Sequence, residues 1–79
     1  MNIDMQEARR LIMLIVKNNH PAGVIYPTLD RLFVLKMPDM IIGGYGNKLM
    51  PLIDEMIDEG IIQQSGHGYI KGSNFPENF

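Results

Sequence analysis

The stretch GNKLMPLIDEMIDEG, residues 46–60, decides the fold together with IIQQSGHGYIKG, residues 61–72. Apolar residues recur in its first part at helical spacing and share one face, whereas carboxylates occupy the opposite face. Gly60 suits the left-handed conformation that ends many helices. The sequence therefore predicts a helix over residues 47–59. Its apolar face consists of Leu49, Leu52, Ile53, Met56 and Ile57.

A short antiparallel hairpin is predicted directly after Gly60. Residues 61–65 suit a strand, residues 66–68 suit a three-residue turn because two of them are glycine, and residues 69–71 suit a returning strand. The tail that follows is polar apart from two phenylalanines. We therefore expect residues 1–72 to form one domain and residues 73–79 to form a C-terminal tail.

The N-terminal half predicts a first helix over residues 4–18, with Asp4 as its N-cap and Glu7 at the capping-box position. The segment from Asn18 to Pro21 stops this helix, because proline cannot continue it. The helix has one apolar stripe facing the core. Its members are Ala8, Leu11, Ile12, Ile15 and Val16.

The middle of the chain predicts a brief strand at residues 24–26 and then a second helix, which begins at Pro27 or is capped by Thr28 and stops at Pro38. Residues 38–46 contain three glycines and predict a partly buried loop. The expected fold is mainly helical α+β: three helices with a small antiparallel sheet, in the order helix, strand, helix, helix, strand, strand. The predicted core contains Leu11, Ile15, Leu32, Phe33, Leu52, Ile53, Met56 and Ile62.

Composition limits the classes of protein. The chain has 79 residues, 46% of them hydrophobic, which fits one small domain. The longest apolar run is far below the roughly 18 residues of a membrane span, and the N-terminus does not resemble a secretory signal. The absence of cysteine excludes disulfides, cysteine-ligated zinc and thiol nucleophiles, and fits a cytoplasmic protein. We expect no membrane association.

The segment LIDEMIDEGIIQQSGHGYIKG, residues 52–72, resembles the end of the recognition helix and the wing of the winged helix-turn-helix superfamily, as found in small bacterial and phage regulators. The resemblance is one of pattern and covers roughly residues 5–72. One departure is a connection between the second and third helices that is longer than the three or four residues of a strict helix-turn-helix.

The resemblance implies a DNA-binding transcription regulator, since the start of a recognition helix and the wing are the parts that contact DNA. Net charge is −2, so the chain lacks the basic excess typical of nucleic-acid-binding proteins. We therefore expect double-stranded DNA to be bound by few groups. These candidates are Thr28, Arg31, Tyr45, Asn47, Lys48, His67 and Lys71.

The same resemblance allows a second interpretation: a winged-helix protein-interaction module without a DNA site, such as a phage-encoded inhibitor or adaptor. Four carboxylates crowd the end of the predicted third helix, where like-charge repulsion and the helix dipole both disfavour them. They form either a docking surface for a cation or a basic partner, or a solvated face, which we favour. A positive surface joining Lys48, Arg31 and Lys71 would favour DNA. A neutral or negative surface there would favour the interaction module.

Catalytic and metal chemistry find little support in the sequence. His20 and His67 have no cysteine or clustered inward carboxylate beside them, so no metal site is expected. Gly46-Asn47-Lys48-Leu49 lacks the hydroxyl residue of a phosphate-binding P-loop. No pair of nucleophile and base is visible, so we expect neither an enzyme nor a cofactor.

The first predicted helix also offers a partner-binding surface. Residues 11–16 are apolar at six successive positions, which wraps apolar groups right around the helix axis. Met13 and Leu14 lie outside the core stripe, among charged residues. Either a second copy of the chain covers them, or the tail folds back with Phe75 and Phe79. We expect a homodimer formed through this helix.

Overall fold

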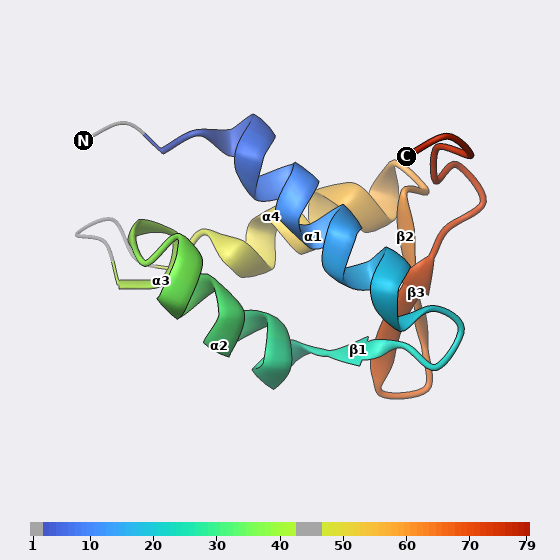
Figure 1. The fold of residues 1–79 in the computed structure, drawn as a ribbon, viewed down its shortest axis with the longest axis horizontal. Helices are drawn as coiled ribbons and strands as arrows, with labels where there is room; N and C mark the ends of the chain where they lie inside the picture. Colours follow the sequence, from blue (N-terminus) through green and yellow to red (C-terminus); the bar gives the residue numbers. More distant parts are fainter. Residues whose placement is uncertain (1–2, 43–46) are drawn as a thin grey trace.

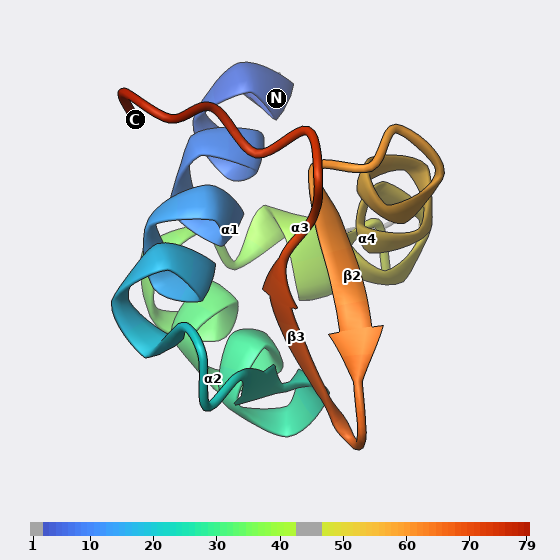
Figure 2. The same ribbon diagram turned by 90° about the vertical axis from the view of Figure 1, so that its right-hand side faces the viewer.

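The computed structural model describes residues 3–42 and 47–79. These residues form a mainly helical α+β fold of four helices and a three-stranded antiparallel sheet (Figure 1). Figure 2 faces the sheet and shows α1 and α4 on either side of it. In chain order the elements are α1 (Met5–Asn19), β1 (Val24–Ile25), α2 (Tyr26–Lys36), α3 (Asp39–Ile42), α4 (Leu49–Asp58), β2 (Ile62–Ser65) and β3 (Gly68–Lys71).

The ends of α1 and α4 follow the local signals in the sequence. The Asp4 carboxylate accepts a hydrogen bond of 3.1 Å from the backbone N–H of Glu7, which satisfies a free donor in the first turn. At the other end of the domain, Gly60 takes a φ of 77° just after α4. Both predicted signals are confirmed.

The start of α2 differs from both alternatives that the sequence offered. The helix begins at Tyr26, one residue before Pro27, which lies in its first turn. No side chain caps this end, so Thr28 is a helical residue and not an N-cap. Proline is tolerated here because the N–H groups of a helix's first turn have no carbonyl partner within the helix, so a residue without an N–H loses no hydrogen bond.

The sheet has the strand order β1-β3-β2, with β3 in the centre. Ile62 pairs with Lys71, and Ser65 pairs with Gly68, so only Gly66 and His67 form the turn between β2 and β3. The predicted three-residue turn is therefore wrong. Gly68 belongs to the sheet instead: it also pairs with Ile25 and is buried against the backbone of β1.

The main departure from the predicted order lies between α2 and α4, where a loop was expected. Residues 39–42 form the short helix α3, which begins after Pro38, and the N–H of Ile42 donates to the Pro38 carbonyl at 2.8 Å. Met40 is fully buried, so the apolar content of this segment does enter the core. The prediction of three helices thus becomes four helices in the described residues.

One hydrophobic core joins α1, α2, α3, α4 and the sheet. Six of the eight residues predicted for it are buried, whereas Leu11 and Leu32 are only half-buried and pack at its edge. Val24 and Tyr69, which the periodicity did not single out, are buried where β1 pairs with β3. The buried apolar residues of α4 are Leu49, Leu52, Ile53 and Met56.

The tail packs back onto the domain. The backbone N–H of Asn74 donates to the Gly60 carbonyl at 2.9 Å, and the Gly72 N–H donates to Ile61 at 2.8 Å. A methyl group on Gly72 would overlap the Gly60 carbonyl, so only glycine fits this crossing. Phe75 is buried and meets Phe79 edge-on, with ring centroids 5.6 Å apart.

Two leucines provide a matched test of this core. Leu52 is 2% exposed in α4, whereas Leu35 is 73% exposed in α2. Replacing Leu52 by Ala should lower the free energy of unfolding by about 2–5 kcal/mol, because the change leaves a cavity in the core. Leu35→Ala should change it by less than about 0.5 kcal/mol. Urea denaturation followed by circular dichroism measures both, and similar losses for the two variants would contradict the fold.

Candidate functional site

The start of α4 is the first part of the predicted DNA-binding site. The Asn47 side-chain oxygen accepts hydrogen bonds from the backbone N–H groups of Leu49, at 2.7 Å, and Met50, at 3.4 Å. Its side-chain nitrogen donates to the Tyr26 hydroxyl at 2.9 Å. Both ends of the Asn47 amide therefore act within the fold, capping α4 and joining it to the start of α2.

Lys48 follows Asn47 and is half-buried. Its backbone N–H donates to the Met40 carbonyl at 2.7 Å, which ties the start of α4 to α3. Tyr45, the third candidate in this region, lies outside the described residues. The start of α4 is thus held by contacts to both neighbouring helices.

The hairpin separates its two candidates. His67 is exposed in the turn between β2 and β3. Lys71 lies at the opposite end of β3, where its ammonium sits 5.1 Å from the centroid of the Phe75 ring and its backbone N–H donates to His20 at 3.3 Å. Lys71 is therefore part of the contact between β3 and the tail.

Lys48 and Lys71 lie at opposite ends of α4. Lys48 precedes the helix, whereas Lys71 pairs with Ile62, shortly after its last turn. A ten-residue helix is about 15 Å long, so the two cations do not share one surface patch. The remaining candidates, Thr28 and Arg31, are exposed on α2. The structure therefore separates Lys48 from Lys71, two of the three cations whose joint positive surface would favour DNA.

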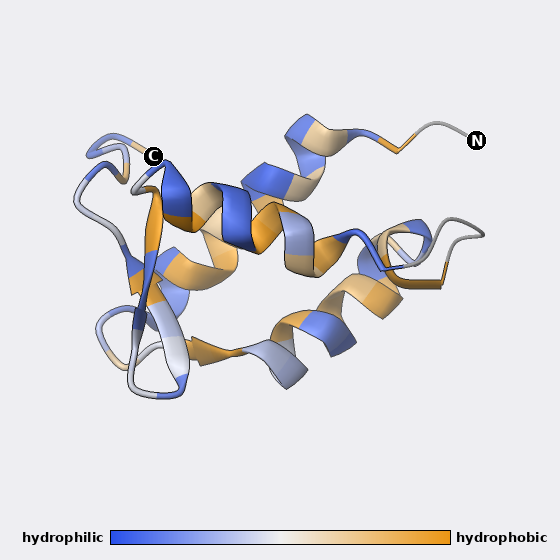
Figure 3. Cartoon of the chain, turned by 180° about the vertical axis from the view of Figure 1, so that it is seen from behind, coloured by the Kyte–Doolittle hydropathy of each residue, from blue (hydrophilic) through white to orange (hydrophobic). Residues whose placement is uncertain are grey.

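Carboxylates dominate the solvent-facing side of α4. Blue and orange segments alternate along this helix in Figure 3, because hydrophilic and hydrophobic residues alternate in its sequence, and its buried residues are all hydrophobic. The exposed residues include all four acids at its C-terminal end: Asp54, Glu55, Asp58 and Glu59.

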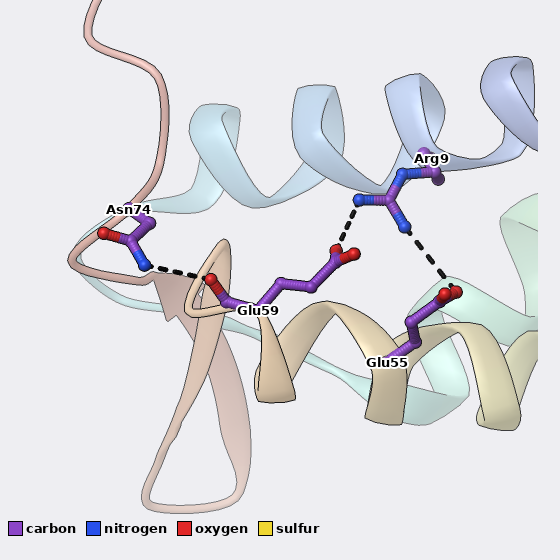
Figure 4. Close-up of polar contacts among 4 residues, drawn as sticks. All are labelled: Arg9, Glu55, Glu59 and Asn74. Carbon is purple, nitrogen blue, oxygen red and sulfur yellow. Dashed lines mark hydrogen bonds and ion pairs between the residues drawn. The ribbon is translucent and has the colours of Figure 1, made fainter.

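Arg9 partly neutralises this acidic cluster from α1 (Figure 4). One guanidinium nitrogen pairs with Glu59, and the other lies 3.6 Å from the Glu55 carboxylate. Asn74 of the tail donates to the Glu59 carbonyl at 3.0 Å. No local pattern predicts the Arg9 contact, because Arg9 and Glu59 are 50 positions apart and their approach depends on how α1 lies beside α4.

The partner-binding candidates of α1 have different surroundings. Met13 is partly buried and packs against the core, whereas Leu14 is half-buried. Lys17, near the end of the helix, donates to the main-chain oxygen of Phe79 at 2.7 Å, so the tail lies beside α1. Of the two explanations for the apolar run, the fold-back of the tail agrees with these contacts. Self-association through Leu14 stays a prediction.

The titratable groups offer no reactive cluster in the part of the chain that the structure describes. Burial raises the pKa of the Tyr69 hydroxyl, and the nearby Asp54 carboxylate and Tyr26 add to this shift. The hydrogen bond from Arg10 lowers the pKa of Glu7. Within residues 3–42 and 47–79, no three metal-binding side chains come together, and no helix has the length and apolarity to cross a membrane.

Comparisons of the chain with protein-family models, with curated proteins and with solved structures found no match.

The role of Asn47 can be tested by two substitutions. Asn47→Ala removes the cap and the bond to Tyr26, and should lower the free energy of unfolding by about 1–2 kcal/mol. Tyr26→Phe removes only the exposed hydroxyl bond and should cost about 0.5 kcal/mol. Both values come from urea denaturation. Equal losses would mean that the cap contributes nothing.

The Arg9 contact predicts a dependence on salt. Arg9→Gln should lower the free energy of unfolding by about 0.5–1 kcal/mol at low ionic strength, because one cation pairs with two largely exposed carboxylates. At about 1 M salt the loss should shrink, since screening weakens exposed pairs. Arg10→Gln, which breaks the pair with Glu7 inside α1, is the control and should cost about 0.3 kcal/mol. A loss for Arg9→Gln that persists at high salt would contradict the ionic contact.

Proposed function

We propose that this chain is a non-enzymatic protein-interaction module of the winged-helix type. The winged-helix assignment is supported by the order of the elements and by the β2–β3 hairpin that directly follows α4. The interaction function is supported by the surface of α4, whose C-terminal end carries four exposed carboxylates, which suit a protein partner better than the phosphates of DNA. An adaptor or an inhibitor encoded by a phage is a function of this kind.

The observation that carries this proposal is that most of the basic side chains, and the Asn47 amide, already contact other groups of the same chain. Duplex DNA carries one negative charge per about 1.7 Å, and proteins that bind it well make roughly 6–10 phosphate contacts. This chain has seven basic residues in total, and the Asn47 amide is engaged at both ends. Four of the basic side chains contact acidic, aromatic or main-chain groups of the same chain, namely Arg9, Arg10, Lys17 and Lys71.

A DNA-binding transcription regulator is the second candidate function. It is favoured by the exposure of His67 in the hairpin turn and of Thr28 and Arg31 on α2. With so few cations, this function would need two copies of the chain on one DNA site. For either function we propose a cytoplasmic protein, in line with the absence of cysteine.

A titration with duplex DNA separates the two functions. A mixed-sequence duplex of about 20 base pairs should show no saturable binding up to roughly 100 μM protein at low salt, because few phosphates can be neutralised. Fluorescence anisotropy of labelled DNA measures this directly. Micromolar binding that Lys48→Glu weakens, and that Lys17→Glu leaves unchanged, would overturn the proposal and establish DNA binding at the start of α4.

A parallel cross-linking experiment in the cells of origin tests whether the chain binds a protein partner. The tagged chain should yield protein adducts without enrichment of any DNA sequence. Enriched DNA fragments of one sequence class would favour the regulator.

A further inference from the structure

The end of α2 and the adjoining α3 expose large apolar side chains. Leu35 and Ile42 are 73% and 69% exposed, more than any other large apolar residue in the described part of the chain, and Val34 is 36% exposed. Single exposed apolar residues are common on protein surfaces. Here three of them occur on two helices that pack together at one end of the molecule (Figure 1).

The sequence of α2 makes this exposure unavoidable. Residues 32–35 read Leu-Phe-Val-Leu, and four successive residues spread over about 300° of a helix surface. The core takes Phe33 completely and Leu32 in part. Val34 and Leu35 are exposed to solvent and take no part in the hydrophobic core.

Two cations of α2 lie close to these apolar groups in the sequence. Arg31 lies one helical turn before Leu35, Lys36 follows it, and both cations are exposed. Neither makes an ion pair or a hydrogen bond through its side chain to another described residue. The acids of these helices, Asp30 and Asp39, are half-buried, so the outermost charge is positive.

We propose that this surface binds an acidic amphipathic helix of a partner protein. We call it the α2–α3 surface. A row of leucine or isoleucine side chains in the partner would cover the exposed apolar groups, and flanking carboxylates would pair with the two cations. The inference rests on the proposed interaction function and names the surface and the partner class for it. The α2–α3 surface consists of Arg31, Val34, Leu35, Lys36 and Ile42.

A second copy of the chain fits this surface less well. The acidic helix that a copy could offer is α4, but its apolar stripe is buried in its own core. Two α2–α3 surfaces facing each other would bring like charges together.

An anionic membrane is also a poorer match. Membrane-binding basic clusters usually hold about 4–8 cations, whereas this surface has two on a chain of net charge −2. Apolar side chains flanked by only two cations therefore favour a protein partner.

Peptide titrations of the isotope-labelled full chain, followed by backbone amide chemical shifts, test the inference. The probe is a designed helix of about 18 residues with leucines at helical spacing and glutamates beside them. It should shift amides of residues 31–42 with a dissociation constant below about 1 mM. Its counterpart with lysine in place of every glutamate should bind at least about tenfold more weakly. The third probe is a vesicle of phosphatidylcholine and phosphatidylglycerol, which should leave the spectrum unchanged.

Surface variants sharpen this test, and their unchanged amide spectra verify folding. Leu35→Ser should weaken the acidic peptide about fivefold or more, whereas Met50→Ser, an exposed apolar residue of α4, should leave binding unchanged. The double variant R31E/K36E should reverse the preference toward the lysine peptide.

Four results would overturn the inference: no saturation at about 1 mM, shifts centred on α4, equal binding of both peptides, or binding to the vesicles alone. These results would leave the interaction function in place if duplex DNA is still not bound. Micromolar DNA binding at α4 would instead overturn the interaction function, whatever the peptides do.

Discussion

The burial of the α4 stripe in a core shared with α1 and the sheet is the constraint on which the rest of this small protein depends. A chain of 79 residues buries only about 60–65% of its unfolded surface, so each large apolar residue contributes a sizeable share of its stability. The four buried residues of α4 meet buried residues of α1 in one cluster. The placement of α4 then constrains β2 and the tail, because Gly60 begins the connection to β2 and its carbonyl accepts a hydrogen bond from Asn74 of the tail.

The polar contacts serve the same arrangement. Arg9 links the outer sides of α1 and α4, Asn47 fixes the start of α4 against α2, and Asn74 closes its end against the tail. Each contact fastens α4 to a different segment of the chain. Of these three side chains, only Asn47 was a candidate for DNA binding, and its amide is engaged at both ends by the fold.

Much of this fold could be predicted because its signals are local. The stripe of α4, the Asp4 cap and the Gly60 stop each depend on residues a few positions apart, where helix geometry fixes the outcome. The short helix α3 escaped prediction because four residues give no full period, and glycines nearby favour a loop. The turn was predicted one residue too long because Gly68 suits a turn as well as a strand. Its place in the sheet depends on its pairing with Ile25 of β1, which is distant in the sequence.

The candidate site was harder to predict because it depends on distant segments. Asn47 is polar and precedes a helix, which suits a DNA contact as well as a cap, and only the hydroxyl of Tyr26 shows which applies. The sequence around Lys71 is that of an ordinary surface strand, but in the structure the Lys71 ammonium lies over the ring of Phe75 in the tail. Such choices depend on tertiary packing, which periodicity does not encode.

The crossing of Gly72 over Gly60 has a mechanical consequence. The backbone bonds of Asn74 to Gly60 and of Gly72 to Ile61 lie at the base of the β2–β3 hairpin. A force applied to Phe79, by a fused domain or an attached partner, must strain these bonds and the Phe75 contact before it reaches the hairpin. The hydrogen bonds at the base of the hairpin therefore transmit a force on the tail to the end of α4. The pairing of β2 with β3 bears this force only after those bonds break.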